Sequence, residues 1–333
     1  MTVAEDAGQF EADVATRVCW HYYKEGCTQE EIAQRLGLTR KRVNQIIGHA
    51  LETGLVKIAI DSRYSACPDL ESRLQAHYDL RLAKVVPSPG PGVDVRTVVG
   101  AAAGQLLSER LGDGETLGVT WGGTICAAAQ NLRRRAGGNT VVSLIGGLAA
   151  SGPVNPYDAA ALFARVLGAP CQYVTAPMFA DSRELRDALL QSVPVKDVLG
   201  RVRNVDRALL SAIDLTERSK ALEYGVISRQ VWRSLRDSGA VGDIAGHYLD
   251  ANGKRVSHPL ADRVISAGLD QLREIGELIL AAGGTHKVPI VRAALRAKLA
   301  HVLITDEAAA AMLLDEEGGS ENDDNAPRGF RLL

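Results

Sequence analysis

Residues 28–47, TQEEIAQRLGLTRKRVNQII, have the pattern of two short helices joined by a tight turn, because apolar residues recur with helical spacing on both sides of Gly37. Thr28 and Glu31 have the spacing of a capping box, and Thr39 is placed to cap the second helix. Gly37 stands where the chain must reverse, and glycine adopts the left-handed backbone conformation that such a turn requires. The stretch therefore predicts a helix-turn-helix.

The outward positions of the second predicted helix carry basic and amide side chains. Basic side chains suit phosphates and guanine edges, and amide side chains suit adenine edges in a major groove. The alternative is an ordinary helical hairpin with a solvated charged face. The glycine position, the two caps and the polar set together favour DNA recognition. The predicted DNA-contacting residues are Thr28, Thr39, Arg40, Lys41, Arg42, Asn44 and Gln45.

The distribution of charge supports this interpretation. The whole chain of 333 residues has a net charge of −2, so no overall basicity points to nucleic acid. Residues 16–60, however, contain seven Lys or Arg against four Glu. A mildly basic head on a near-neutral body is typical of a DNA reader fused to another domain, and the length predicts about two or three domains.

Further elements can be placed around this motif. Residues 11–25 predict a helix that completes a three-helix head after a frayed start at residues 1–9, and LVKIAI at residues 55–60 alternates like the strand of a wing. Residues 68–78 predict another helix. The predicted organisation is a winged helix-turn-helix domain at 1–60, a helical connector at 61–80, an effector domain at 81–315 and an acidic, disordered tail at 316–333.

The five cysteines are scattered, odd in number and without CxxC spacing, which predicts reduced thiols and neither a disulfide framework nor a zinc site. His247, His258 and His286 also lack metal-ligand spacing. The N-terminus is acidic and lacks the apolar run of a signal peptide, and no stretch has the length needed to span a bilayer. We therefore expect a cytoplasmic protein with no membrane partner, no cofactor and no metal.

From Arg81 onward, short apolar runs alternate with helical stretches. Such alternation predicts an α/β domain with a parallel sheet covered on both faces, whose ligands bind at the carboxyl ends of the strands. The runs that predict strands are LAKVVPS, TLGVTW, TVVSLIGG, CQYVTAP, RALLSAI and HVLITD.

The most informative strand end is GVTWGGT at residues 118–124, directly before a predicted helix. Gly122 and Gly123 let backbone amides point together at a helix N-terminus, where an anion is favoured, and threonine hydroxyls flank them. A tight structural turn is the alternative, and the spacing does not match the dinucleotide pattern GxGxxG. The predicted effector contacts here are Thr120, Trp121, Gly122, Gly123 and Thr124.

Other loops add candidates. Gly147 and Leu148 follow the run VVSLI, and Asn155 precedes a helix, where a cap is favoured over a ligand contact. Asp243 lies between glycines on a predicted loop and suits sugar hydroxyls, with an Asx-turn as the alternative. Lys287 follows a glycine pair and suits a phosphate, with a solvated surface lysine as the alternative.

The motifs at 28–47, 118–124, 141–148, 239–253 and 281–295 together resemble the SorC-type family of bacterial sugar-responsive transcriptional regulators. The resemblance spans residues 14–314 and implies a winged helix-turn-helix head with a Rossmann-like effector domain similar in fold to sugar-phosphate isomerases and deaminases. It also implies a homo-oligomer, a dimer or tetramer, that binds double-stranded operator DNA near sugar-catabolism genes and a carbohydrate or sugar-phosphate effector. The effector contacts implied by the resemblance are Thr120, Gly122, Gly123, Thr124, Gly147, Leu148, Asp243 and Lys287.

Two departures from that family pattern stand out. SAID at residues 211–214 replaces a Gly-x-Gly type of loop, and Asn44–Gln45 replaces a Ser-Arg pair. The family's operator sequence therefore cannot be transferred to this chain. The sequence favours a DNA-binding transcriptional regulator of a carbohydrate-catabolism operon, whose operator affinity is controlled by a sugar, polyol or sugar-phosphate effector. An isomerase or deaminase with a helical head is the enzyme alternative, for which Asp243 is the one candidate base. A scaffold whose head binds protein is the third hypothesis.

Overall fold

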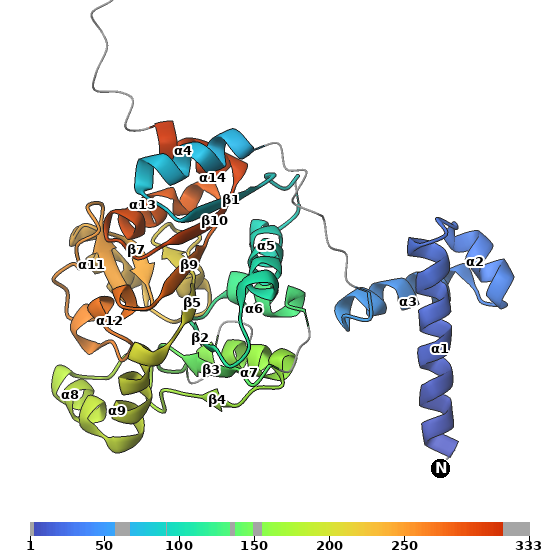
Figure 1. The fold of residues 1–333 in the computed structure, drawn as a ribbon, viewed down its shortest axis with the longest axis horizontal. Helices are drawn as coiled ribbons and strands as arrows, with labels where there is room; N and C mark the ends of the chain where they lie inside the picture. Colours follow the sequence, from blue (N-terminus) through green and yellow to red (C-terminus); the bar gives the residue numbers. More distant parts are fainter. Residues whose placement is uncertain (1–2, 57–66, 91, 134–136, 149–154, 316–333) are drawn as a thin grey trace, which may run out of the picture. The chain divides into compact units, whose positions relative to one another are not determined.

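The computed structural model describes residues 3–56, 67–90, 92–133, 137–148 and 155–315. The chain divides into two compact units, residues 1–60 and residues 61–333, and each is described by itself (Figure 1). The predicted wing strand at 55–60 falls largely outside the described residues, as does the predicted tail at 316–333. Within the described residues, none of the helices combines the length and apolar character needed to cross a membrane.

The head consists of helices α1 (Val3–Tyr23), α2 (Gln29–Leu36) and α3 (Arg40–Glu52). Its small core contains Val18, Ile32, Val43 and Ile47, which come from all three helices. The predicted helix-turn-helix is present, but α1 begins at Val3, so the prediction of a frayed start was wrong.

The caps of the head follow the sequence pattern. Glu31 donates its backbone N–H to the Thr28 hydroxyl, and the Glu31 carboxylate accepts from the Thr28 backbone N–H at 2.7 Å. Gly37 ends α2 with φ of 65°, the left-handed conformation. Thr39 accepts a hydrogen bond from the Arg42 backbone N–H and so begins α3.

The larger unit is built on a seven-stranded parallel sheet with the order β1-β10-β9-β5-β2-β3-β4. Side chains alternate between two apolar layers: Leu278 and Leu280 face one, and Ile279 and Ala281 face the other. The strands are β1 (Leu82–Val86), β2 (Thr116–Val119), β3 (Thr140–Ser143), β4 (Cys171–Gln172), β5 (Arg207–Leu210), β9 (Glu277–Ala281) and β10 (Val302–Asp306). Each predicted run contains a strand, whereas β9 was missed.

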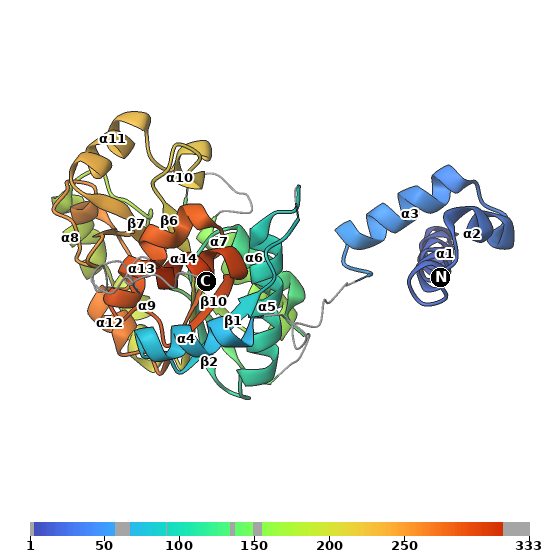
Figure 2. The ribbon, with the colours of Figure 1, turned by 90° about the horizontal axis from the view of Figure 1, so that it is seen from above.

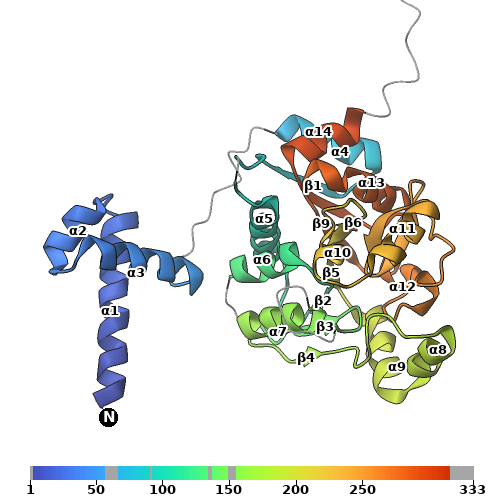
Figure 3. The ribbon, with the colours of Figure 1, turned by 180° about the vertical axis from the view of Figure 1, so that it is seen from behind.

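Helices cover both faces of this sheet, as Figures 2 and 3 show from two further directions. The face that carries Ile279 is covered by α5 (Val95–Arg110), α6 (Gly123–Asn131) and α7 (Pro156–Leu167). The opposite face is covered by α4 (Pro68–Tyr78), α9 (Val193–Gly200), α13 (Val288–Arg296) and α14 (Glu307–Asp315). The remaining α-helices of the described part of this unit are α8 (Arg183–Gln191), α10 (Lys220–Glu223), α11 (Arg229–Asp237) and α12 (Leu269–Arg273).

Helix α4, the core of the predicted connector, packs within the larger unit. Leu74 is fully buried among the apolar side chains of the sheet. The Tyr78 hydroxyl donates a hydrogen bond to the Leu313 carbonyl of α14 at 2.9 Å. Helix α4 therefore contributes to the core of the α/β unit.

A second, antiparallel sheet was not predicted. It consists of β6 (Ala212–Asp214), β7 (Ala240–Ile244) and β8 (His247–Asp250). Asp243 therefore lies in a strand, opposite Ile213 and Tyr248, and the prediction of a loop at this position was wrong. Glycines concealed the strand: a Cβ on Gly242 would lie 2.4 Å from the Ile213 carbonyl oxygen, so glycine here permits a close approach of two strands.

Candidate DNA-reading surface and effector cleft

The polar residues of α3 lie on the side opposite the core of the head. Val43 and Ile47 are buried, which turns the remaining positions of the helix outward. Asn44 accepts a hydrogen bond from the Gln29 side chain at 3.3 Å, which links this surface to α2. The exposed residues of α3 in the predicted set are Arg40, Lys41, Arg42, Asn44 and Gln45.

The two threonines of the predicted DNA-contacting set, Thr28 and Thr39, also cap helices. Both hydroxyls accept from backbone amides at the start of a helix, so they orient α2 and α3. Three cationic side chains then occupy the first turn of α3, where the helix dipole also favours phosphate. This arrangement suits insertion of α3 into a major groove with the caps close to the backbone.

The main cleft of the α/β unit has a volume of about 1160 Å³ and is bordered by segments that follow β1, β5 and β9. These strand ends meet at the carboxyl edge of the sheet, the edge where open α/β sheets bind ligands. Both charge signs line the cleft. Its cationic lining residues are Arg96, Arg218, Lys220, Arg229 and Lys287, its acidic ones are Asp94, Asp214, Glu217 and Glu223, and His286 adds an imidazole.

Lys287 is the buried cation of this cleft. It is only 6% exposed, and burial lowers the pKa of its ammonium while the Asp214 carboxylate opposes that shift. Asp214 accepts from the Thr216 backbone N–H at 2.9 Å and from the Thr216 hydroxyl at 2.5 Å. His286 Nε2 lies 3.8 Å from the second Asp214 oxygen, and burial lowers the pKa of this imidazole. Together, Lys287, His286 and Asp214 can donate hydrogen bonds to a ligand with several hydroxyls and accept hydrogen bonds from it.

Among the predicted effector residues, Lys287 lines this cleft, and Thr120 of the glycine turn forms hydrogen bonds within the fold. The Thr120 hydroxyl accepts from the Ser211 N–H at 3.1 Å and donates to the Leu209 carbonyl at 3.4 Å. Ser211 Oγ donates to the Trp121 carbonyl at 2.5 Å. The turn after β2 is thereby bonded to the turn after β5. Thr124, in the first turn of α6, is buried as well.

Arg96 joins the glycine turn to the cleft. A Cβ on Gly123 would lie 3.0 Å from Arg96 Nη1, so the guanidinium lies directly over this glycine. Asp94 binds Arg96 through both carboxylate oxygens at 2.8 and 3.0 Å from Nε, and this pairing raises the pKa of Arg96. Gly122 has φ of 118°, a conformation that favours glycine, and caps α6. A guanidinium therefore contacts the start of α6, where the sequence predicted an anion.

The loop after β3 also makes close contacts within the fold. Gly147 bridges to Pro177, and a Cβ on Gly147 would lie 2.3 Å from the Tyr157 ring. Asn155 caps α7 by accepting from the Tyr157 N–H at 3.1 Å, and its amide donates to the Leu148 carbonyl at 3.0 Å. The cap that the sequence favoured for Asn155 is therefore present.

Asp243 lies near Asp214 and Lys287 without lining the cleft. Burial raises the pKa of its carboxyl to about 7, Asp214 adds to the shift, and the Gly246 amide and Lys287 oppose it. The hydrogen bond from the Gly246 N–H is 2.9 Å long. Asp243 thus makes a small contribution to the electrostatic environment of Lys287, after burial and Asp214.

Several cleft residues were missed in the sequence. Asp94 precedes a helical run and has the signal of an N-cap, which is its observed role. Arg96 and Lys220 belong to segments far apart in the sequence, and His286 was tested only for metal-ligand spacing. No local pattern brings these positions together, because the sheet order does so.

Comparisons with known proteins agree with both units. The family model described as "Putative sugar-binding domain" matches residues 62–315, and the model for sigma-70 region 4 matches residues 18–53. The transcriptional regulator LsrR of Enterobacter sp. (strain 638) is 32% identical over 307 residues, which are 90% of this chain and 92% of that protein. The erythritol catabolism regulatory protein EryD of Brucella abortus is 30% identical over 300 residues, 89% of this chain and 95% of that protein.

Solved structures show the same fold. The full-length sorbitol operon regulator SorC from Klebsiella pneumoniae superposes with a TM-score of 0.70 at 23% identity and covers 91% of this chain and 99% of its own. The chain therefore belongs to the family of transcriptional regulators that carry this sugar-binding domain. Its relatives are regulators and not enzymes, which decides against the isomerase or deaminase alternative.

Proposed function

We propose that this regulator binds double-stranded operator DNA through α3 and binds a polyhydroxylated effector, a sugar, polyol or sugar phosphate, in the cleft around Lys287. The observation that carries the proposal is the buried ammonium of Lys287 beside the Asp214 carboxylate at the carboxyl edge of a parallel sheet. Carboxylates accept hydrogen bonds from hydroxyls, and the surrounding cations suit an anionic end. Erythritol and sorbitol stand in the names of two relatives and support this ligand class.

Regulation would follow from linkage between the two units. An effector that binds one arrangement of the oligomer better shifts operator affinity by at most its differential affinity. A coupling of about 1–3 kcal/mol changes operator affinity roughly 5- to 150-fold. We further propose a cytoplasmic homo-oligomer, a dimer or tetramer, because two identical heads can read two half-sites of one operator.

The test is fluorescence anisotropy of labelled DNA from upstream of the gene, titrated with protein at two salt concentrations and with a panel of sugars, polyols and sugar phosphates. We expect salt-sensitive, sequence-preferring binding that one compound of the panel shifts. Lys287→Gln should remove the shift and retain operator binding, whereas Lys254→Gln, at an exposed lysine outside the cleft, should respond normally.

Two results would contradict the proposal. An absence of preference over random DNA at both salt concentrations would mean that α3 does not read this site and would favour a protein-binding head. A normal effector response in Lys287→Gln would place the ligand outside this cleft.

A further inference from the structure

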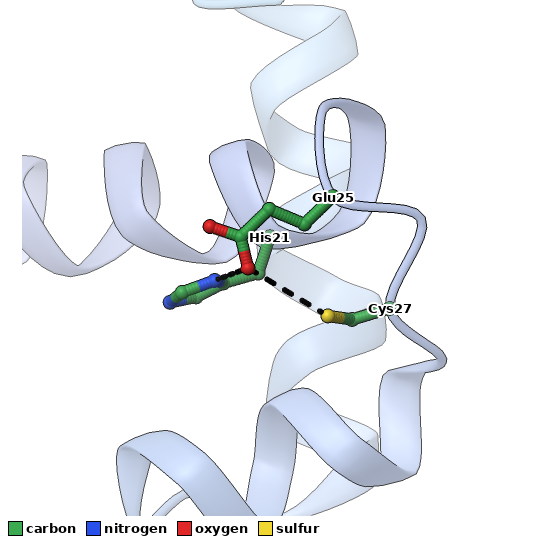
Figure 4. Close-up of side chains that lie close together, drawn as sticks. All are labelled: His21, Glu25 and Cys27. Atoms are coloured by element: carbon green, nitrogen blue, oxygen red, sulfur yellow. Dashed lines mark hydrogen bonds and ion pairs between the residues drawn. The ribbon is translucent and has the colours of Figure 1, made fainter.

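Three side chains that commonly bind transition metals meet where α1 ends, as Figure 4 shows. His21 Nδ1 lies 2.9 Å from Glu25 Oε2, and Cys27 Sγ lies 3.9 Å from the same oxygen. The imidazole nitrogen, the carboxylate oxygen and the thiol sulfur all lie within 4.8 Å of one another. The cluster belongs to the head and is separate from the effector cleft.

The backbone explains how these residues converge. His21 lies in the last turn of α1 and Glu25 follows two residues after its end, and their four-residue spacing brings the two side chains together. Gly26 has φ of 69°, and this left-handed turn lets the Cys27 backbone N–H donate to the His21 carbonyl at 3.0 Å. The chain therefore returns beneath the helix and places the Cys27 thiol beside the two other groups.

We propose that His21, Glu25 and Cys27 form a site for a zinc-like divalent cation. Nitrogen, oxygen and sulfur donors in one set are typical of Zn²⁺, and three protein ligands leave a fourth position for water. In a tetrahedral site with ordinary bond lengths, the donor atoms would stand about 3.3–3.6 Å apart. The present distances lie on both sides of that range, so rotations of the side chains suffice. Neutral imidazole with one carboxylate and one thiolate balances the 2+ charge.

Access and support for the ion are present. The His21 and Glu25 side chains are 23% and 40% exposed, which gives a cation a path from solvent, whereas Cys27 is buried. Arg35 of α2 donates to the Glu25 carboxylate at 3.2 Å and would orient this ligand, as hydrogen-bond partners of metal-bound carboxylates do. A bound ion would thus connect the end of α1, the turn and α2.

The site has a consequence for DNA binding. Cys27 directly precedes Thr28, whose cap begins the helix-turn-helix. A metal on Cys27 would fix that junction and favour the folded head, because the ion binds the assembled ligands better than the unfolded chain. The sequence prediction of no zinc site considered CxxC spacing and three other histidines, whereas the present cluster is HxxxExC.

The test uses the reduced full-length protein and Co²⁺ as a spectroscopic probe for Zn²⁺. We expect one Co²⁺ per chain with a thiolate charge-transfer band that Zn²⁺ displaces. Cys27→Ser should lose the band, whereas Cys19→Ser, at a second buried cysteine of the head that lies within α1, should keep it. Retention of the band in Cys27→Ser would overturn the proposal.

A second variant keeps the proposal testable if Cys27→Ser fails to fold. Glu25 is exposed, so Glu25→Gln should leave the head folded, as checked by circular dichroism. We expect the affinity for Zn²⁺, measured by competition with a chelator, to fall at least about tenfold in this variant. An unchanged affinity would overturn the assignment. Neither result bears on the effector cleft, so this test is independent of the proposed function.

Discussion

The helix-turn-helix and the glycine turn after β2 contain similar residues that the fold uses differently. Both have threonines within two residues of a glycine near the start of a helix. In the head, Thr28 and Thr39 each accept from an amide three residues away, and the polar face of α3 stays exposed. In the larger unit, the Thr120 hydroxyl bonds to Leu209 and Ser211 and is fully buried. Capping within one helical turn leaves the polar face of α3 exposed to a partner. The hydroxyl of Thr120, in contrast, already forms its hydrogen bonds with residues distant in the sequence.

We expect the largest effect, a loss of operator affinity, from substitutions on the exposed face of α3. Arg40→Ala combined with Arg42→Ala removes two cations from the first turn of α3. At about 1–3 kcal/mol for each contact, operator affinity should fall at least roughly 30-fold. Anisotropy of labelled operator DNA at fixed salt measures the loss, and isothermal titration with the effector should be unchanged.

Arg17→Ala provides the control for that variant. Arg17 is also an exposed arginine of the head, but it lies on α1 in an ion pair with Asp13. We expect its operator affinity to stay close to that of the unmodified protein, since exposed ion pairs contribute little. Retained DNA affinity in the double variant would break the comparison and remove α3 from the interface.

The second prediction concerns the buried carboxyl of Asp243 and the pH dependence of the free energy of unfolding. The folded-state pKa of Asp243 is raised to about 7 from its ordinary value of 3.8, so its contribution to stability is complete below pH 4 and is lost as pH rises through 7. Asp243→Asn removes this titration. The free energy of unfolding of Asp243→Asn relative to the unmodified protein should therefore increase by about 1.4 kcal/mol per pH unit between pH 4 and 7.

The difference between the two proteins is the quantity to measure, by urea unfolding at several pH values. Burial also lowers the pKa of His247 to about 4. The contribution of His247 to stability is therefore lost as pH falls from about 6.5 to 4, which opposes the effect of Asp243 in the same range. Subtraction cancels His247, which is common to both. A difference that does not change with pH would mean that Asp243 is ionised in the folded protein throughout the range.

The same contrast between local and long-range contacts explains which features could be predicted from the sequence. Helix caps and helical period depend on residues within one or two turns, so Thr28, Gly37 and the outward face of α3 could be predicted. The partners of Thr120 lie about 90 residues away, and a local pattern cannot show that its hydroxyl is already bonded. Glycines in β7 imitate a loop, because close strand contact and chain reversal both select glycine.

The third prediction separates a binding turn from a structural one. Gly122 has φ of 118°, and a Cβ there would lie 3.3 Å from Ser211 Oγ. Gly122→Ala should therefore lower the free energy of unfolding of the larger unit by about 1–3 kcal/mol, and Gly122→Val by more. The effector response should weaken together with stability, while the head stays folded. Gly114→Ala, in an open turn that also has positive φ, is the control for backbone strain without the Ser211 contact.

We expect the smallest effect on the free energy of unfolding from the loss of a helix N-cap, and Thr39 and Asn155 allow a comparison of the two units. Thr39→Ala and Asn155→Ala each remove the side chain that accepts a backbone N–H at a helix start, which costs about 1 kcal/mol. Asn155→Ala should cost more of the two, because Asn155 is buried and also bonds the Leu148 carbonyl. Urea unfolding should assign the Thr39 loss to the head and the Asn155 loss to the larger unit, and only Thr39→Ala should weaken operator binding directly. If Asn155→Ala instead abolishes the effector response with the free energy of unfolding unchanged, Asn155 is a ligand contact. A buried loop residue of the larger unit would then contact a partner, as the exposed residues of α3 are proposed to do, despite its hydrogen bonds within the fold.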